Sequence, residues 1–235
     1  MLDAARERLN TATPDNARVL DVGGWASPLP RADDVLDLLP YATRGLYGSQ
    51  DAAPERFTEA TWVQRDICDH EPWPYADDAF DIAVCSHTLE DVRDPVWVCR
   101  ELSRVAKSGY VEVPAPAQEL TWGVHGPWVG WSHHHWICEA EEEGSGLRFT
   151  FKPHLLGASG RHLPPSTLDG VTEEDRVISR WWQGVICAHE QVLIGAQDLD
   201  GWLASLLDAH GGPGPDPPPT ARRPRWPQRP RRPQR

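Results

Sequence analysis

The stretch ARVLDVGGWASPLPRADDVLDLL, residues 17–39, constrains the fold of this chain more than any other segment. An apolar run ends in Asp21, Gly23 and Gly24, as the first strand of a nucleotide-binding fold does. Two prolines follow where such folds begin a helix, and proline disrupts helices because it lacks an N–H and clashes with the preceding turn. A second apolar run then ends in Asp37. We therefore expect a strand, an irregular loop and a second strand.

Short apolar runs alternate with helical patterns along the body of the chain, which indicates βαβ units and a mostly parallel sheet. The clearest helix begins at Asp94-Pro95, continues to Lys107 and is closed by Gly109. We expect strands at residues 18–22, 34–37, 61–65, 80–86 and 109–113. The predicted fold class is α/β, with a mostly parallel central sheet, an antiparallel edge and flanking helices.

The pattern changes after Pro116, where residues 120–143 form an insertion rich in tryptophan, glycine and histidine. Residues 147–154, LRFTFKPH, alternate like a strand of a hairpin or an edge strand, and residues 178–195 indicate another strand. A final helix is expected over residues 198–210, with leucines and a tryptophan on one face.

Composition separates the chain into one domain, residues 1–210, and a tail, residues 211–235. The tail has nine prolines and seven arginines, so it has little to bury and is predicted to be disordered. The net charge is −12 overall and −18 for the body alone, which would repel a phosphate backbone and makes nucleic acid an unlikely substrate. No apolar run approaches the length of a bilayer span, so we expect a cytoplasmic protein outside membranes.

The opening loop favours S-adenosylmethionine (SAM) over a nicotinamide cofactor. A pyrophosphate needs the N–H groups of a helix N-terminus, which Pro28 and Pro30 remove. SAM has no phosphate; it needs glycines for close approach of the backbone, an acid for the ribose and carboxylates near its positive charges. A nicotinamide oxidoreductase is therefore disfavoured.

A second stretch is more specific: RDICDHEPWPYADDAFDIAVCSHTLEDVRDPVWVCRELSRVAKSGYVEVPAP, residues 65–116. With the opening loop, it resembles the class I SAM-dependent methyltransferases, particularly the type 11 group. The resemblance implies a Rossmann-like methyltransferase fold and SAM as the cofactor. It also implies a set of cofactor-binding residues: Asp21, Gly23 and Gly24 in the first loop, Asp37 at the ribose, Asp66 and Ile67 at adenine, and Ser86 with His87 near the methionine part.

Two departures from the family pattern leave an alternative open. The loop has two adjacent glycines instead of three spaced ones, and Trp25 follows them. Where the family often has E-H-V, this chain has Glu90-Asp91-Val92. The alternative is a catalytically inactive methyltransferase-like module with a binding or regulatory role.

The histidine-rich insertion has three interpretations: a metal site, a substrate loop, and a surface turn whose histidines have no specific role. His125, His133, His135 and Cys138 are candidate metal ligands, but in an extended chain only His133 and His135 of the triplet would point to one side, so no metal site is predicted. As a substrate loop after the fifth strand, the segment would shape a pocket for a small-molecule acceptor. His87 or His135 is the candidate general base for methyl transfer to an oxygen, nitrogen or carbon.

A nucleic-acid methyltransferase would require the basic tail, and no oligomeric state is predicted.

Overall fold

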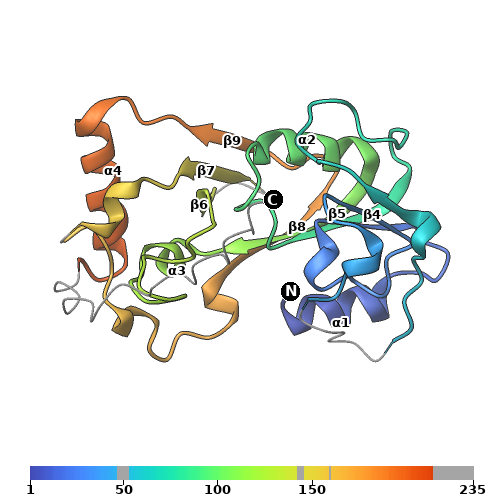
Figure 1. The fold of residues 1–235 in the computed structure, drawn as a ribbon, viewed down its shortest axis with the longest axis horizontal. Helices are drawn as coiled ribbons and strands as arrows, with labels where there is room; N and C mark the ends of the chain where they lie inside the picture. Colours follow the sequence, from blue (N-terminus) through green and yellow to red (C-terminus); the bar gives the residue numbers. More distant parts are fainter. Residues whose placement is uncertain (47–52, 142–145, 159, 214–235) are drawn as a thin grey trace, which may run out of the picture.

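The main sheet has six strands in the order β3-β2-β1-β4-β5-β8 (Figure 1). The computed structural model describes residues 1–46, 53–141, 146–158 and 160–213, so nearly all of the predicted tail lies outside the described residues. Five strands are parallel and β8 pairs antiparallel to β5, which confirms the predicted sheet with an antiparallel edge. The strands are β1 (Val19–Val22), β2 (Asp34–Asp37), β3 (Trp62–Gln64), β4 (Phe80–Ser86), β5 (Ala106–Pro114) and β8 (Val177–Gln183).

Helices cover both faces of this sheet, as Figure 1 shows. Helix α1 (Asp3–Ala12) places Ala5 and Leu9, one turn apart, against one face. Helix α2 (Pro95–Val105) packs its apolar stripe on the other face. The carboxylate of Asp94 accepts a hydrogen bond from the Trp97 N–H at 2.9 Å and caps α2, and a proline at the first helical position supports the same start. The strands alternate their buried side chains between the two faces, as the period of two requires.

The predicted end of the clearest helix is wrong. Helix α2 ends at Val105 and β5 begins at Ala106, whereas the sequence pattern placed the end near Gly109. Residues 106–109 instead pair with β4, where Gly109 lies opposite Ala83. Ladder hydrogen bonds to the neighbouring strand therefore override the local helical pattern.

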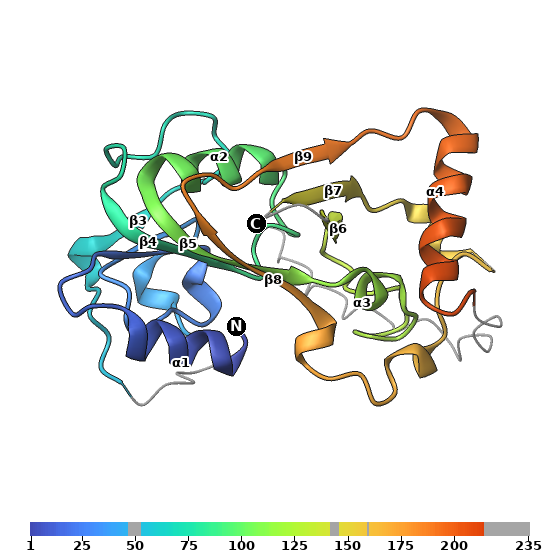
Figure 2. The ribbon, with the colours of Figure 1, turned by 180° about the vertical axis from the view of Figure 1, so that it is seen from behind.

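The segment after β5 builds a second, three-stranded sheet that the sequence did not predict (Figure 2). Its strands are β6 (Trp136–Ala140), β7 (Leu147–Phe151) and β9 (Ala188–Gln191). The strand expected in a hairpin or at an edge is β7, which pairs antiparallel with β6 and parallel with β9. The single strand expected over residues 178–195 is two strands, β8 and β9, in different sheets. The chain leaves β8 at Gly184, which has a φ of 75° that favours glycine.

Two further helices accompany this second sheet: α3 (Pro116–Leu120) and the predicted C-terminal helix α4 (Gly195–Ala209). Leu203 and Leu207 of α4 are buried in a cluster with Leu120 and Ile137. Short 3-10 turns complete the chain: η1 (Gly24–Ala26), η2 (Tyr41–Thr43), η3 (Glu59–Thr61), η4 (His154–Gly157), η5 (Pro165–Leu168) and η6 (Glu174–Arg176). Among the described residues, no helix is both long and apolar enough to cross a membrane.

Gly109 provides a test of the packing at the centre of the sheet. A Cβ at this position would lie 2.0 Å from the Ala83 carbonyl oxygen and 2.6 Å from the ring of Trp182. We expect Gly109→Ala to lower the free energy of unfolding by about 1–3 kcal/mol, measured by urea denaturation. The control is Gly201→Ala on α4, where a Cβ meets no atom within 4 Å and improved helix propensity should raise stability by about 1 kcal/mol. Equal unfolding midpoints for the two variants would contradict this account.

Candidate functional site

A cavity of about 380 Å³ lies at the carboxyl ends of β1 and β4. The strand order reverses between β1 and β4. Strands β2 and β3 lie beyond β1, whereas β5 lies beyond β4. Open α/β sheets bind ligands at such a switch point. Five predicted residues line the cavity together: Asp21, Gly23, Gly24, Ser86 and His87. Its volume is within the range of small-molecule sites.

The loop after β1 adopts the irregular path that its prolines predict. Only the single 3-10 turn η1 forms before β2. Gly23 has a φ of 77°, and a Cβ there would lie 2.2 Å from the Thr88 hydroxyl oxygen. A Cβ on Gly24 would lie 2.1 Å from a carboxylate oxygen of Asp21. Contacts within the protein therefore leave no room for a side chain at either position, and this holds whatever ligand the cavity binds.

The carboxylate of Asp21 lies against this loop. It is buried and accepts a hydrogen bond from the Leu29 N–H at 2.8 Å. Burial raises the pKa of Asp21 to about 7, because a charged carboxylate loses its hydration there. Near neutral pH, Asp21 can therefore exist either as an acceptor-only carboxylate or as a neutral hydrogen-bond donor.

Glu112 is the centre of the polar network on the other wall. It lies in β5 directly opposite Ser86 of β4, and 1% of its surface is exposed. One carboxylate oxygen accepts from the Leu2 N–H at 2.9 Å and from the Tyr110 hydroxyl, and the other lies 2.9 Å from His87 Nε2 and 3.3 Å from the Ser86 hydroxyl. These donors satisfy a buried charge that would otherwise be strongly unfavourable.

His87 is held between two acids. Its Nε2 faces Glu112 and its Nδ1 lies 3.3 Å from Glu90, while its backbone has a φ of 52°, in the left-handed region that is uncommon for residues other than glycine. Burial lowers the pKa of His87, but hydrogen bonds to Glu112 and Glu90 outweigh burial and raise it to about 9. Burial raises the pKa of Glu112, but its hydrogen bonds prevail and lower it to about 2. The pair is thus an imidazolium and a carboxylate at neutral pH.

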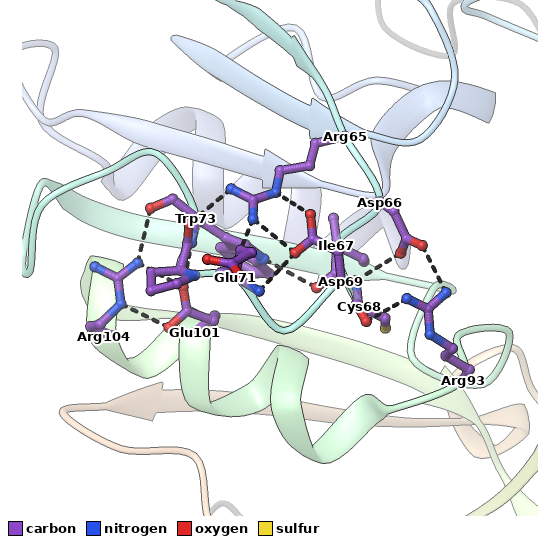
Figure 3. Close-up of polar contacts among 11 residues, drawn as sticks. Arg65, Asp66, Ile67, Cys68, Asp69, Glu71, Trp73, Arg93, Glu101 and Arg104 are labelled. Carbon is purple, nitrogen blue, oxygen red and sulfur yellow. Dashed lines mark hydrogen bonds and ion pairs between the residues drawn. The ribbon is translucent and has the colours of Figure 1, made fainter.

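Three predicted cofactor residues do not line this cavity. Both oxygens of Asp37 accept backbone N–H groups, from Trp25 at 2.9 Å and from Leu39 at 2.7 Å. Asp66 forms an ion pair with Arg93 at 2.7 Å, as Figure 3 shows. Ile67 is buried, and its carbonyl accepts from the Trp73 indole at 3.1 Å. Asp37 ends β2, and Asp66 and Ile67 follow β3, apart from the cavity walls.

The histidine triplet is arranged differently from the prediction. His133 and His134 line the cavity together with Asp91, whereas the exposed side chain of His135 does not. The assumption of an extended chain was wrong, because residues 132 and 133 form a turn and consecutive side chains then share one side. Of the other metal candidates, His125 stacks on Trp131 with its ring centroid 6.5 Å from that of His133, whereas Cys138 is buried in β6.

The polar residues of the site that sequence reasoning missed include Glu90, Asp91, Glu112 and His134. Glu112 carried a signal, since it is a lone acid inside the apolar strand YVEVP. An acid inside a buried strand needs partners and so indicates a polar cluster. Glu90 and Asp91 lie in a turn and His134 follows another, and their convergence depends on contacts distant in the sequence.

The His87–Glu112 pair makes the stability of the folded protein depend on pH, and the direction follows from the pKa of His87. Because the pKa of His87 rises from 6.5 to about 9 on folding, its stabilising contribution is complete below pH 6.5 and is lost as the pH rises through about 9. We expect an NMR titration midpoint for His87 near pH 9, lower by about one unit or more in Glu112→Gln. Glu190→Gln, an exposed change on β9, is the control. An unchanged midpoint in Glu112→Gln would show that the pair does not set the pKa.

Comparison with known proteins adds a family match. Residues 41–111 match the family model described as a methyltransferase domain, less than a third of the chain. The search of curated proteins found no match.

Solved structures show weaker likenesses. The YcgJ protein of Bacillus subtilis is 22% identical, with 46% of this chain and 49% of that chain covered and a TM-score of 0.36. An S-adenosylmethionine-dependent methyltransferase from Mesorhizobium loti is 20% identical, with 52% and 59% covered and a TM-score of 0.32. The chain thus spans about half the length of these structures. The family match over residues 41–111 overlaps the stretch 65–116 whose motifs indicated it, and this part of the chain is thus similar to a methyltransferase domain.

Proposed function

We propose that this protein transfers the methyl group of SAM to a small-molecule acceptor. The observation that carries the proposal is the cavity at the β1–β4 switch point, which is lined by the loop after β1 and by the end of β4. The family match to a methyltransferase domain supports the same reaction class. A nicotinamide cofactor fits less well, because η1 is one 3-10 turn and offers no helix N-terminus to a pyrophosphate.

Two carboxylates of the cavity wall suit a cationic cofactor. Glu90 lines the cavity and Asp21 borders it from the loop after β1, while Arg6 and the protonated His87 also line it. A sulfonium and an ammonium group gain from nearby carboxylates, since opposite charges attract strongly in a partly desolvated site. Contact of Asp37 with the ribose would require the cofactor to extend beyond the cavity towards the end of β2.

His87 is the proposed general base, and His135 has no part in the proposed site. With a pKa of about 9, His87 is mostly protonated at neutral pH and cannot accept a proton. A bound sulfonium would lower this pKa, because a like charge disfavours the imidazolium. Loss of a proton from the acceptor to His87 would accompany attack of the acceptor on the methyl carbon, while the bond from that carbon to sulfur breaks and releases S-adenosylhomocysteine.

Binding of the cofactor can be tested without knowing the acceptor. Ser27 is exposed and lines the cavity, so Ser27→Trp should fill part of it and weaken binding of S-adenosylhomocysteine about tenfold or more, measured by isothermal titration calorimetry. The matched control is Ser166→Trp on η5, an exposed serine that does not line the cavity. No binding heat with either SAM or S-adenosylhomocysteine in the unchanged protein would contradict the proposal and favour the inactive module.

The role of His87 can be tested once an acceptor panel yields turnover, followed as release of S-adenosylhomocysteine. We expect kcat to increase with pH, with a midpoint below about 9, because the bound sulfonium lowers the pKa of His87. His87→Gln should lower kcat by about 10²–10⁴-fold and abolish this increase. His189→Gln, an exposed change on β9, is the control. A wild-type pH profile in His87→Gln would exclude His87 as the base.

A further inference from the structure

We propose that Asp91, His133 and His134 bind a divalent transition-metal ion, with Zn²⁺ as the probe, on the wall of the cavity. One potential ligand atom from each residue lies within 4.8 Å of the others. It is the one such group of three or more found within residues 1–46, 53–141, 146–158 and 160–213. Two imidazoles and one carboxylate suit Zn²⁺ and related ions better than Mg²⁺ or Ca²⁺, which prefer oxygen ligands.

The distances leave room for an ion between the three side chains. Nε2 of His134 lies 3.8 Å from one oxygen of Asp91, and Nε2 of His133 lies 4.0 Å from the other. Both separations are too long for hydrogen bonds. Ligands at 2.0–2.2 Å from a tetrahedral ion lie about 3.4 Å apart. The three ligand atoms lie within 4.8 Å of one another, so binding requires a modest approach of the side chains, chiefly of His133, which is 56% exposed.

A buried carboxylate fixes His134 in the orientation that metal binding requires. Nδ1 of His134 lies 2.7 Å from Glu119, which is fully buried and is held in turn by the Lys152 ammonium at 2.7 Å. With its proton on Nδ1, the imidazole keeps the lone pair of Nε2 directed towards Asp91. Histidines that bind metals commonly donate their other N–H to a carboxylate in this way.

Two further observations distinguish this group from a chance meeting of surface charges. The oxygen of Asp91 that faces His134 is buried and has no hydrogen-bond partner among the described residues. Buried polar atoms without partners are rare, and a metal ion would supply the missing partner. Trp131 stacks on His134, with ring planes 15° apart, and meets His133 edge-on, so both imidazoles are held beside the cavity.

Three protein ligands leave a coordination position open, and all three residues line the cavity. An acceptor hydroxyl bound at that position would lose its proton more readily, because the ion stabilises the oxyanion. This consequence rests on the proposed methyl transfer and points to an acceptor that has a hydroxyl group. Binding of the ion itself does not depend on that function.

The test titrates Zn²⁺ into untagged, metal-stripped protein by isothermal titration calorimetry. Cys187, an exposed thiol, is replaced by serine throughout, so that it cannot bind the ion. We expect about one Zn²⁺ per chain, no competition from excess Mg²⁺, and a visible absorption spectrum of low coordination number when Co²⁺ replaces Zn²⁺. His134→Ala and Asp91→Asn should each weaken Zn²⁺ binding about 100-fold.

His135→Ala is the matched control, because it removes the neighbouring imidazole that lies outside the cavity. Glu119→Gln tests the positioning role, with an expected loss of 10–100-fold in metal affinity and unchanged stoichiometry. Absence of Zn²⁺ binding, or binding lost in His135→Ala but kept in His134→Ala, would overturn the proposal. Circular dichroism melts confirm that each variant is folded.

The two proposals fail separately. Binding of S-adenosylhomocysteine without binding of Zn²⁺ would reject the metal site and leave the methyltransferase proposal in place. Binding of Zn²⁺ without binding of SAM or S-adenosylhomocysteine would reject the methyltransferase proposal and leave the metal site in place.

Discussion

The buried carboxylate of Glu112 is the constraint on which the site depends. A charge placed inside a central strand must be compensated, and the compensation comes from the start of the chain, from the same strand and from the neighbouring strand. The backbone of His87 also donates to the Glu112 carbonyl at 2.8 Å, which fixes the turn after β4. One acid thus links α1, β4 and β5 at the edge where the cavity opens.

Local patterns in the sequence predicted much of the main sheet. The first four expected strands agree with β1 to β4 within one residue at each end, because apolar runs bounded by turn residues have few alternatives. The loop after β1 also followed from its prolines. Five of the predicted site residues meet because strands of known direction bring their ends together at one edge.

Contacts distant in the sequence account for what the patterns missed. Helix α2 ends and β5 begins where the chain pairs with β4. Residues 178–195 form two strands instead of one because β8 pairs with β5 in the main sheet and β9 pairs with β7 in the second sheet. Asp91 and His134 are more than forty residues apart, and only the folded chain places them 3.8 Å from each other. The pKa of His87 likewise depends on Glu112, an acid in another strand.

The link between the two sheets separates the two walls of the cavity. The Ile186 N–H donates to the Ser103 hydroxyl of α2 at 2.9 Å, and the Ile186 side chain is buried in the core of the main sheet. The second sheet is therefore anchored to the main body, while Trp131 and His133 reach the cavity from the segment between α3 and β6. That segment can change without altering the glycine loop across the cavity. Substitutions in this segment would then change which acceptor binds, while the wall formed by the glycine loop would still bind the same cofactor.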